Sequence, residues 1–107
     1  MKNRVEITFG IGSDKNGKPV DGYIDVDKQL ATIQRGAAKR FGGSTLIFGE
    51  GSWLDGSHNL VAEECVVLRI DGVEDVESVR QFAGLIRDTF NQSSILFSAT
   101  PLAVEFI

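Results

Sequence analysis

The 107-residue chain contains one cysteine, one histidine and only two prolines. A single cysteine cannot form an intramolecular disulfide, and one histidine beside it cannot complete a zinc finger or a multi-histidine metal site. We therefore expect no metal ion and no cofactor within one subunit. The sequence also lacks a recognisable nucleophile with a base and an orienting group, so it assigns no catalytic residue.

Basic side chains are in the minority, with 11 Lys and Arg against 15 Asp and Glu, which gives a net charge of −4. A protein that binds the backbone of a long nucleic acid usually carries a basic excess, so this class of partner is disfavoured. The charge is unevenly distributed, because residues 1–53 hold eight basic and six acidic side chains and residues 54–107 hold three and nine. A small anion therefore remains a possible ligand.

Long hydrophobic runs are also missing. Uncharged apolar stretches such as residues 44–49 and 65–68 fall far below the roughly 18–20 residues that span a bilayer. The N-terminus interleaves Lys2, Arg4 and Glu6 with apolar residues, unlike a secretion signal. We expect a cytoplasmic protein with no membrane partner, and its length and 42 % hydrophobic content fit a single domain over residues 1–107.

Hydrophobic periodicity predicts the order strand, helix, strand, strand, helix, strand. The expected elements lie at residues 5–11, 27–41, 45–53, 60–70, 75–91 and 94–107. Asp27 and Asp75 are the expected N-caps. Residues 94–97 and 103–107 are strand-like, and Pro101 between them is expected to mark a sheet edge or an interruption of the last strand. This order predicts an α+β, ferredoxin-like βαββαβ fold, with a four-stranded antiparallel sheet and two helices on one face.

The loop after the first strand contains Gly12-x4-Gly17-Lys18, which resembles the start of a phosphate-binding P-loop. Pro19 stands where a Ser or Thr should bind magnesium, and no helix begins there, so the sequence predicts a mobile turn instead. Backbone amides of this loop, with Lys15 or Lys18, could still contact an anion.

Three uncommon residues have both a structural and a functional interpretation. His58 lies among turn residues, which predicts an exposed position at a hairpin tip. Cys65 lies in an apolar run, which is typical of a small core residue. Trp53 could stack on a ligand ring, although a core or interface position is the more frequent role of such a residue.

The sheet face away from the helices is the expected ligand surface. It should present Glu6 and Thr8, and it becomes half apolar and half charged if the strand at residues 60–70 turns its odd-numbered side chains, Glu63 and Arg69 among them, to the same side. Such a face favours pairing with a second copy of the chain, which would enclose Glu6, Glu63 and Arg69 in a cleft. The candidate ligand-binding residues are Glu6, Thr8, Lys18, Trp53, Glu63 and Arg69.

Three short strings resemble a family of small bacterial and phage proteins that is known only as a domain of unknown function. They are Phe41-Gly42-Gly43-Ser44-Thr45-Leu46, Gly49-Glu50-Gly51-Ser52-Trp53 and Phe90-Asn91-Gln92-Ser93-Ser94-Ile95-Leu96, and Glu63 is a fourth match. The resemblance runs from about Ile7 to Phe106 and implies an α+β sheet domain without an assigned activity. It carries over Gly49, Gly51, Trp53, Glu63 and Gln92 as motif positions. Ser52 and Ser93 depart from the Gln and Glu that the family usually has.

The leading functional hypothesis is a non-enzymatic, homo-oligomeric module that binds a small ligand, such as a phage protein that sequesters an anionic or nucleotide-like signalling molecule. One alternative is a small cofactor-independent enzyme with its site between the sheet and a partner subunit. Glu6 or Glu63 would then be the general base, and Arg69 would stabilise an anion. Another alternative is a protein-interaction module that uses the acidic second helix.

Overall fold

The computed structural model describes residues 1–107. Apolar and polar side chains alternate along β1 (Asn3–Gly10), which is an inner strand of the sheet. Val5, Ile7 and Phe9 are buried on one side of this strand, whereas Glu6 and Thr8 are half-buried on the other. The further strands are β2 (Thr45–Leu54), β3 (Leu60–Val73) and β4 (Leu96–Pro101), and the antiparallel order across the sheet is β2-β3-β1-β4. The predicted ferredoxin-like βαββαβ fold is confirmed.

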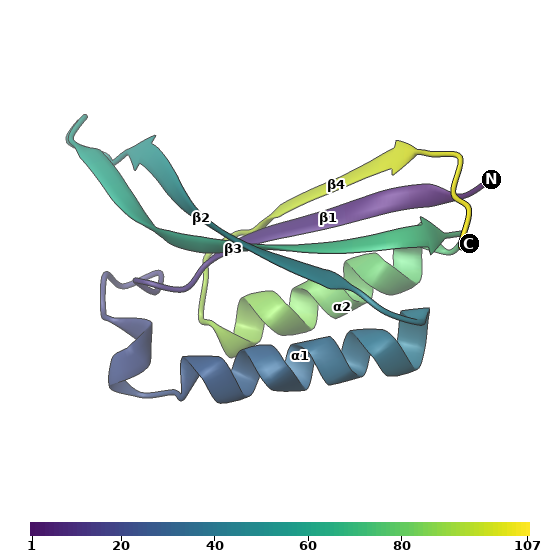
Figure 1. Cartoon of the computed structure of the whole chain (residues 1–107). Coiled ribbons are helices and arrows are strands. Elements are labelled where there is room, and N and C mark those ends of the chain that lie inside the picture. Colours follow the sequence, from purple (N-terminus) through teal and green to yellow (C-terminus); the bar gives the residue numbers. More distant parts are fainter.

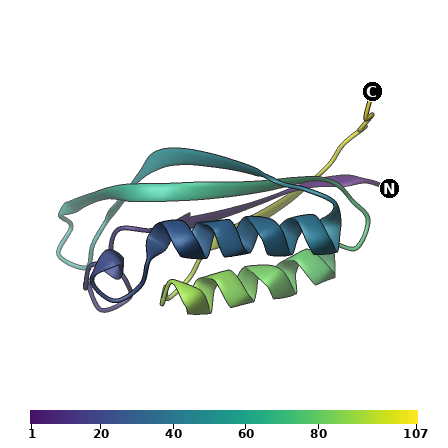
Figure 2. The same ribbon diagram turned by 60° about the horizontal axis from the view of Figure 1, so that its bottom comes forward.

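Two helices, α1 (Val26–Phe41) and α2 (Val76–Thr89), lie side by side against one face of the sheet (Figures 1 and 2). Their apolar stripes, the inward side chains of β1 and β3, and the flanking residues Ile11, Val20 and Phe90 form a single core of 17 buried residues. Gly36 lets the helices approach closely, because a Cβ there would lie 3.3 Å from the Phe82 ring. Phe41 packs edge-on against the same ring. The other face of the sheet is not covered by any element (Figure 2).

The start of α1 differs from the expectation. Asp25, not Asp27, is the N-cap, and its carboxylate accepts a hydrogen bond from the Lys28 backbone N–H at 3.1 Å. Asp27 lies in the first turn, where the helix dipole favours a carboxylate. An aspartate is therefore expected at either position, and the sequence alone did not distinguish them. Asp75 is confirmed as the N-cap of α2 and accepts from the Ser78 N–H at 3.2 Å.

The last strand is one segment that ends at Pro101, so the expected interruption with a second piece at residues 103–107 was wrong, whereas the edge position that Pro101 indicated is confirmed. Register with β1 sets its bounds: Phe97 pairs with Ile7 and packs against the core, and Pro101 is the last paired residue. Leu102 N–H still donates to Lys2 O at 3.0 Å, and the chain beyond it, including residues 103–107, is not a strand. A short 3-10 helix, η1 (Val20–Gly22), is an element that the sequence analysis did not anticipate.

Strand β3 turns its odd-numbered side chains to the open face of the sheet, as the predicted ligand face required. Val66, Leu68 and Ile70 are fully buried on the helix side, and the odd-numbered Cys65 and Arg69 are half-buried on the open face. The expectation of Cys65 as a core residue was therefore wrong, because the apolar run around it alternates between the two faces.

The β2–β3 hairpin extends past the ends of the helices, on the opposite side of the molecule from the two termini (Figure 1). Its tip carries His58, exposed and in the left-handed region with φ 62°. The segment before α1 and the turn between α2 and β4 lie at this same end of the fold (Figure 1). Neither α-helix combines the length and apolar character of a membrane-spanning segment.

Candidate functional site

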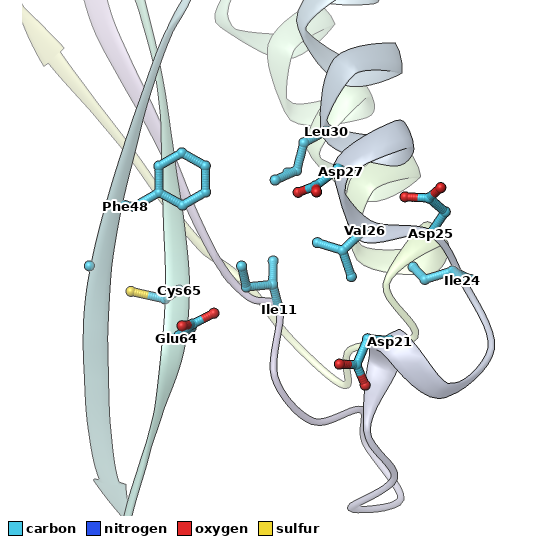
Figure 3. Close-up of a pocket in the computed structure, with 11 residues that line it drawn as sticks. Ile11, Asp21, Ile24, Asp25, Val26, Asp27, Leu30, Phe48, Glu64 and Cys65 are labelled. Carbon is cyan, nitrogen blue, oxygen red and sulfur yellow. The ribbon is translucent and has the colours of Figure 1, made fainter.

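Two clefts adjoin the hairpin. One lies between the hairpin and the beginning of α1, has a volume of about 550 Å³ and is shown in Figure 3. Its apolar wall includes Ile11, Val26, Leu30 and Phe48, and acidic side chains such as Asp27 and Glu64 adjoin it. None of the six candidate ligand residues lines this cleft.

The second cleft lies between the end of β1, the hairpin and the turn after α2, with a volume of about 700 Å³. This volume falls within the range of roughly 300–1,000 Å³ that is usual for small-molecule sites. It brings together three of the candidate residues, namely Thr8, Trp53 and Glu63. Its wall also includes Ser13, Lys15, Gln92 and the hydroxyl-bearing Ser93 and Ser94. We call this second cleft the hairpin cleft.

Glu63 is positioned by the absence of side chains on the neighbouring strand. A Cβ added to Gly10 would overlap Glu63 Oε1, and one added to Gly12 would lie 3.0 Å from Glu63 Oε2. In the space that these glycines leave, Glu63 Oε2 accepts a hydrogen bond from the Ser13 N–H at 2.7 Å. The two glycines were a signal of this contact, because a glycine at the end of a strand often marks a close approach by another group.

Gln92 lies beside Glu63, and sequence reasoning had assigned it no role beyond the family resemblance. Its Nε2 donates to Ser13 O at 2.9 Å and to Phe90 O at 3.0 Å, which uses both amide hydrogens. Its Oε1 accepts no hydrogen bond from the protein and lies 3.3 Å from the point where a Gly10 Cβ would stand. The cleft thus contains two neighbouring oxygen acceptors, a carboxylate and an amide carbonyl.

Asp14 organises the loop that forms one wall of the cleft. It is 8 % exposed, and its carboxylate accepts hydrogen bonds from the N–H groups of Asn16 and Lys18, from the Tyr23 hydroxyl and from Asn91 Nδ2. Burial raises the pKa of this carboxyl, but the hydrogen bonds outweigh burial and hold the pKa below its usual value. The same interactions connect the loop to the turn after α2.

Every backbone N–H from Ser13 to Lys18 already has a protein acceptor. Glu63 takes Ser13 N–H, Asn91 O takes Lys15 N–H, and the carboxylate and carbonyl oxygens of Asp14 take those of Asn16, Gly17 and Lys18. The Asp14 N–H donates to Lys18 O. The expectation that loop amides could contact an anion is therefore wrong, because these donors are satisfied internally.

The remaining candidate residues lie outside the hairpin cleft. Glu6 and Arg69 face each other on the open sheet face with 3.3 Å between Oε2 and Nη2, and each side chain is about one-third exposed, at 33 % and 32 %. Next to them Arg4 makes a two-point contact with Asp71, and these hydrogen bonds hold the pKa of Asp71 below its usual value. Lys18 does not line the cleft, whereas Lys15 does.

Trp53 is 45 % exposed, so it is a wall of the cleft and not a core residue. Its place follows from strand alternation, since Trp53 pairs with Val61 on the open side and Leu54 pairs with Leu60 on the helix side. No cluster of three or more His, Cys, Asp or Glu side chains is arranged to hold a metal ion.

Comparison with solved structures finds the same fold in a phage S-adenosylmethionine lyase. The complex of that enzyme with S-methyl-5′-thioadenosine matches with a TM-score of 0.65 and 20 % identity, over 92 % of this chain and 80 % of the other. Its apo form matches with a TM-score of 0.62 and 19 % identity, over 92 % and 78 %. No family model and no curated protein matches the chain.

The resemblance to the uncharacterised family therefore stays a prediction. Four of the five positions that it carries over, Gly51, Trp53, Glu63 and Gln92, nevertheless line the hairpin cleft, and Gly49 lines the other cleft. Positions far apart in the sequence thus converge on one site.

Asp14 gives the fold a predictable response to acid. Because its folded pKa lies below the ordinary value of 3.8, its contribution to stability is present above that value and is lost as pH falls through the folded pKa. We expect Asp14→Asn to lower the melting temperature at pH 7, and the difference from the wild type to shrink below about pH 4. Thermal unfolding from pH 7 to pH 2 checks this, and a difference that stays constant with pH would contradict it.

Proposed function

We propose that this protein binds a small nucleoside that carries sulfur, of the S-adenosylmethionine and methylthioadenosine class, in the hairpin cleft. The observation that carries the proposal is the convergence of Trp53, Glu63 and Gln92 on one cleft of suitable volume. The shared fold with a phage lyase that binds methylthioadenosine supports this choice of ligand class.

The chemistry of the cleft suits such a ligand. The indole of Trp53 offers a flat surface on which an adenine ring can stack. Glu63 and Gln92 Oε1 are acceptors, so they suit ribose hydroxyls or a cationic group, while Ser93 and Ser94 can both donate and accept. A ligand with hydroxyl or cationic groups therefore fits better than a polyphosphate.

We also propose that the chain self-associates through its open sheet face. Ile47 and Leu96 are 37 % and 64 % exposed there, and Val67 lies between them in the register of the strands, which makes an apolar strip that only Thr8 interrupts. This apolar strip adjoins the hairpin cleft, because Leu96 also lines it. A second copy would cover the strip and narrow the cleft, as the half-apolar face of the sequence analysis suggested.

Two outcomes of binding are open to such a site. In the leading version the protein sequesters the nucleoside without changing it. The second candidate is an elimination from S-adenosylmethionine, favoured by the activity named for the structural neighbour. A general base removes a proton from the carbon next to the one that carries sulfur, and the electrons of that C–H bond form a carbon–carbon double bond. The carbon–sulfur electron pair returns to sulfur, so the products are methylthioadenosine and an unsaturated amino acid. Glu63 is then the better choice of general base than Glu6, which is paired with Arg69 outside the cleft.

Binding is tested with methylthioadenosine by calorimetry and thermal shift. We expect saturable binding by the wild type and, in Trp53→Ala, an affinity lower by about tenfold to a hundredfold, since stacking on an aromatic ring contributes about 1–3 kcal/mol per base. Leu54→Ala is the matched control, because Leu54 is the next residue after Trp53, is 62 % exposed and points to the opposite face of the strand. Absence of binding to the wild type would exclude this function.

Catalysis is tested by incubating the protein with S-adenosylmethionine and measuring methylthioadenosine by chromatography. If the protein is a lyase, Glu63→Gln should reduce release by about a hundredfold or more, the usual size of a general-base contribution. Glu64→Gln is the control, because Glu64 is the adjacent exposed carboxylate on the other face of the strand. This change should leave the release of methylthioadenosine unchanged. Binding without release by the wild type would support sequestration.

Self-association is tested by measuring the mass in solution with light scattering. We expect Ile47→Lys to convert the oligomer to a monomer, because it places a charge within the apolar strip. Leu85→Lys introduces the same charge at a position on α2 that is 54 % exposed, away from the sheet face, and should leave the mass unchanged. A wild-type monomer at micromolar concentration would contradict the proposed association.

A further inference from the structure

Lys15 is the only basic side chain that lines the hairpin cleft. No carboxylate lies within ion-pair distance of its ammonium group, since the ion pairs of the protein involve other residues. The adjacent carboxylate of Asp14 already accepts four hydrogen bonds, and Glu63 accepts one from the loop backbone. The cleft therefore contains a cation whose charge no protein group neutralises directly.

The backbone under Lys15 is held in place although its side chain is exposed. The Lys15 N–H donates to Asn91 O at 2.9 Å, and Asn91 itself adopts a left-handed conformation with φ 49°. Asn91 Nδ2 in turn donates to Asp14 at 3.3 Å. These contacts fix the point from which the lysine reaches into the cleft, so binding an anion there requires ordering only of the side chain.

The anion that suits this arrangement carries a single charge. A phosphate group usually binds to several free backbone amides at once, and in this loop all of those from Ser13 to Lys18 are occupied. The carboxylates of Asp14 and Glu63 also line the cleft and would repel a multiply charged phosphate. A carboxylate needs only one cation and fits these limits.

We propose that Lys15 is a specificity residue that binds the carboxylate of an amino-acid side chain carried by the nucleoside, while Glu63 faces its ammonium group. This proposal rests on the proposed function and adds the residue that selects between its two kinds of ligand. The Lys15 ammonium and the Glu63 carboxylate in the same cleft complement a zwitterion, so the site should prefer a nucleoside that carries an amino acid over methylthioadenosine, which lacks both charges.

A pair of thioether nucleosides isolates this interaction. S-adenosylhomocysteine and methylthioadenosine share the adenosine and the sulfur, but only the former carries the amino-acid carboxylate and ammonium. We expect the wild type to bind S-adenosylhomocysteine more tightly, and Lys15→Gln to weaken that binding about tenfold while leaving methylthioadenosine binding unchanged. Lys15→Arg should retain most of the preference, and raising the ionic strength should reduce it.

Lys18→Gln is the matched control, because it removes the same charge from the same loop at a position outside the cleft. The proposal is overturned if Lys15→Gln affects both nucleosides equally, affects neither, or has the same effect as Lys18→Gln. Those results would leave the proposed function intact, since methylthioadenosine would still bind. If the wild type binds neither nucleoside, the proposed function fails and this proposal fails with it.

Discussion

The contact of Glu63 with the end of β1 and with the loop after it joins the walls of the cleft. Gly10 and Gly12 leave the space that the carboxylate occupies, and its hydrogen bond to Ser13 connects β3 to the loop after β1. From Ser13, the side chain of Gln92 continues the connection to the turn after α2. Three segments that are distant in sequence are joined in this way, and the buried carboxylate of Asp14 reinforces the same junction. A bulkier residue at Gly10 would disturb all of these contacts together.

Strand alternation separates the parts of the molecule that stabilise the fold from those that form the site. Along β3, Val66 and Leu68 are fully buried against the helices, while Cys65 and Glu63 line the hairpin cleft. The core can therefore be well packed without restricting the chemistry of the open face. Packing between the two helices also explains why α1 contains Gly36. Glycine is unfavourable within a helix, but here it allows close contact with Phe82 of α2.

The element order and the fold class could be predicted from the sequence because both depend on local periodicity. The two-residue alternation in β1 and the three- to four-residue spacing in α1 and α2 are strong signals, and both match the burial pattern. Boundaries were harder: Asp25 and Asp27 are the same residue type two positions apart, so the sequence gives nearly the same signal for a helix start at either. The interval after Pro101 looked like a strand because its residues are apolar, but no strand is available to pair with it.

The candidate site was predicted only in part. Thr8, Trp53 and Glu63 share a cleft because they lie on the open face near one end of the sheet, which strand parity can indicate. The sequence left Lys15 and Lys18 as alternatives, because the choice between them depends on how the Asp14 hydrogen bonds fold the loop. Glu6 and Arg69 lie on the expected face, yet their direct pairing and their distance along the strands keep them out of the cleft.

The hairpin has a further consequence for how this protein can diverge. No residue of β2 is fully buried, and its register with β3 runs without interruption from Thr45 opposite Arg69 to Leu54 opposite Leu60. The tip is held by the Asp55 side chain, which accepts from the N–H groups of Ser57 and Asn59. A one-residue insertion in this tip would shift β2 relative to β3 and exchange Trp53 for a neighbour from the other face. None of the 17 buried core residues belongs to β2, so descendants of such a chain would keep that core, apart from the packing of Leu46 against it, while acquiring a different binding wall.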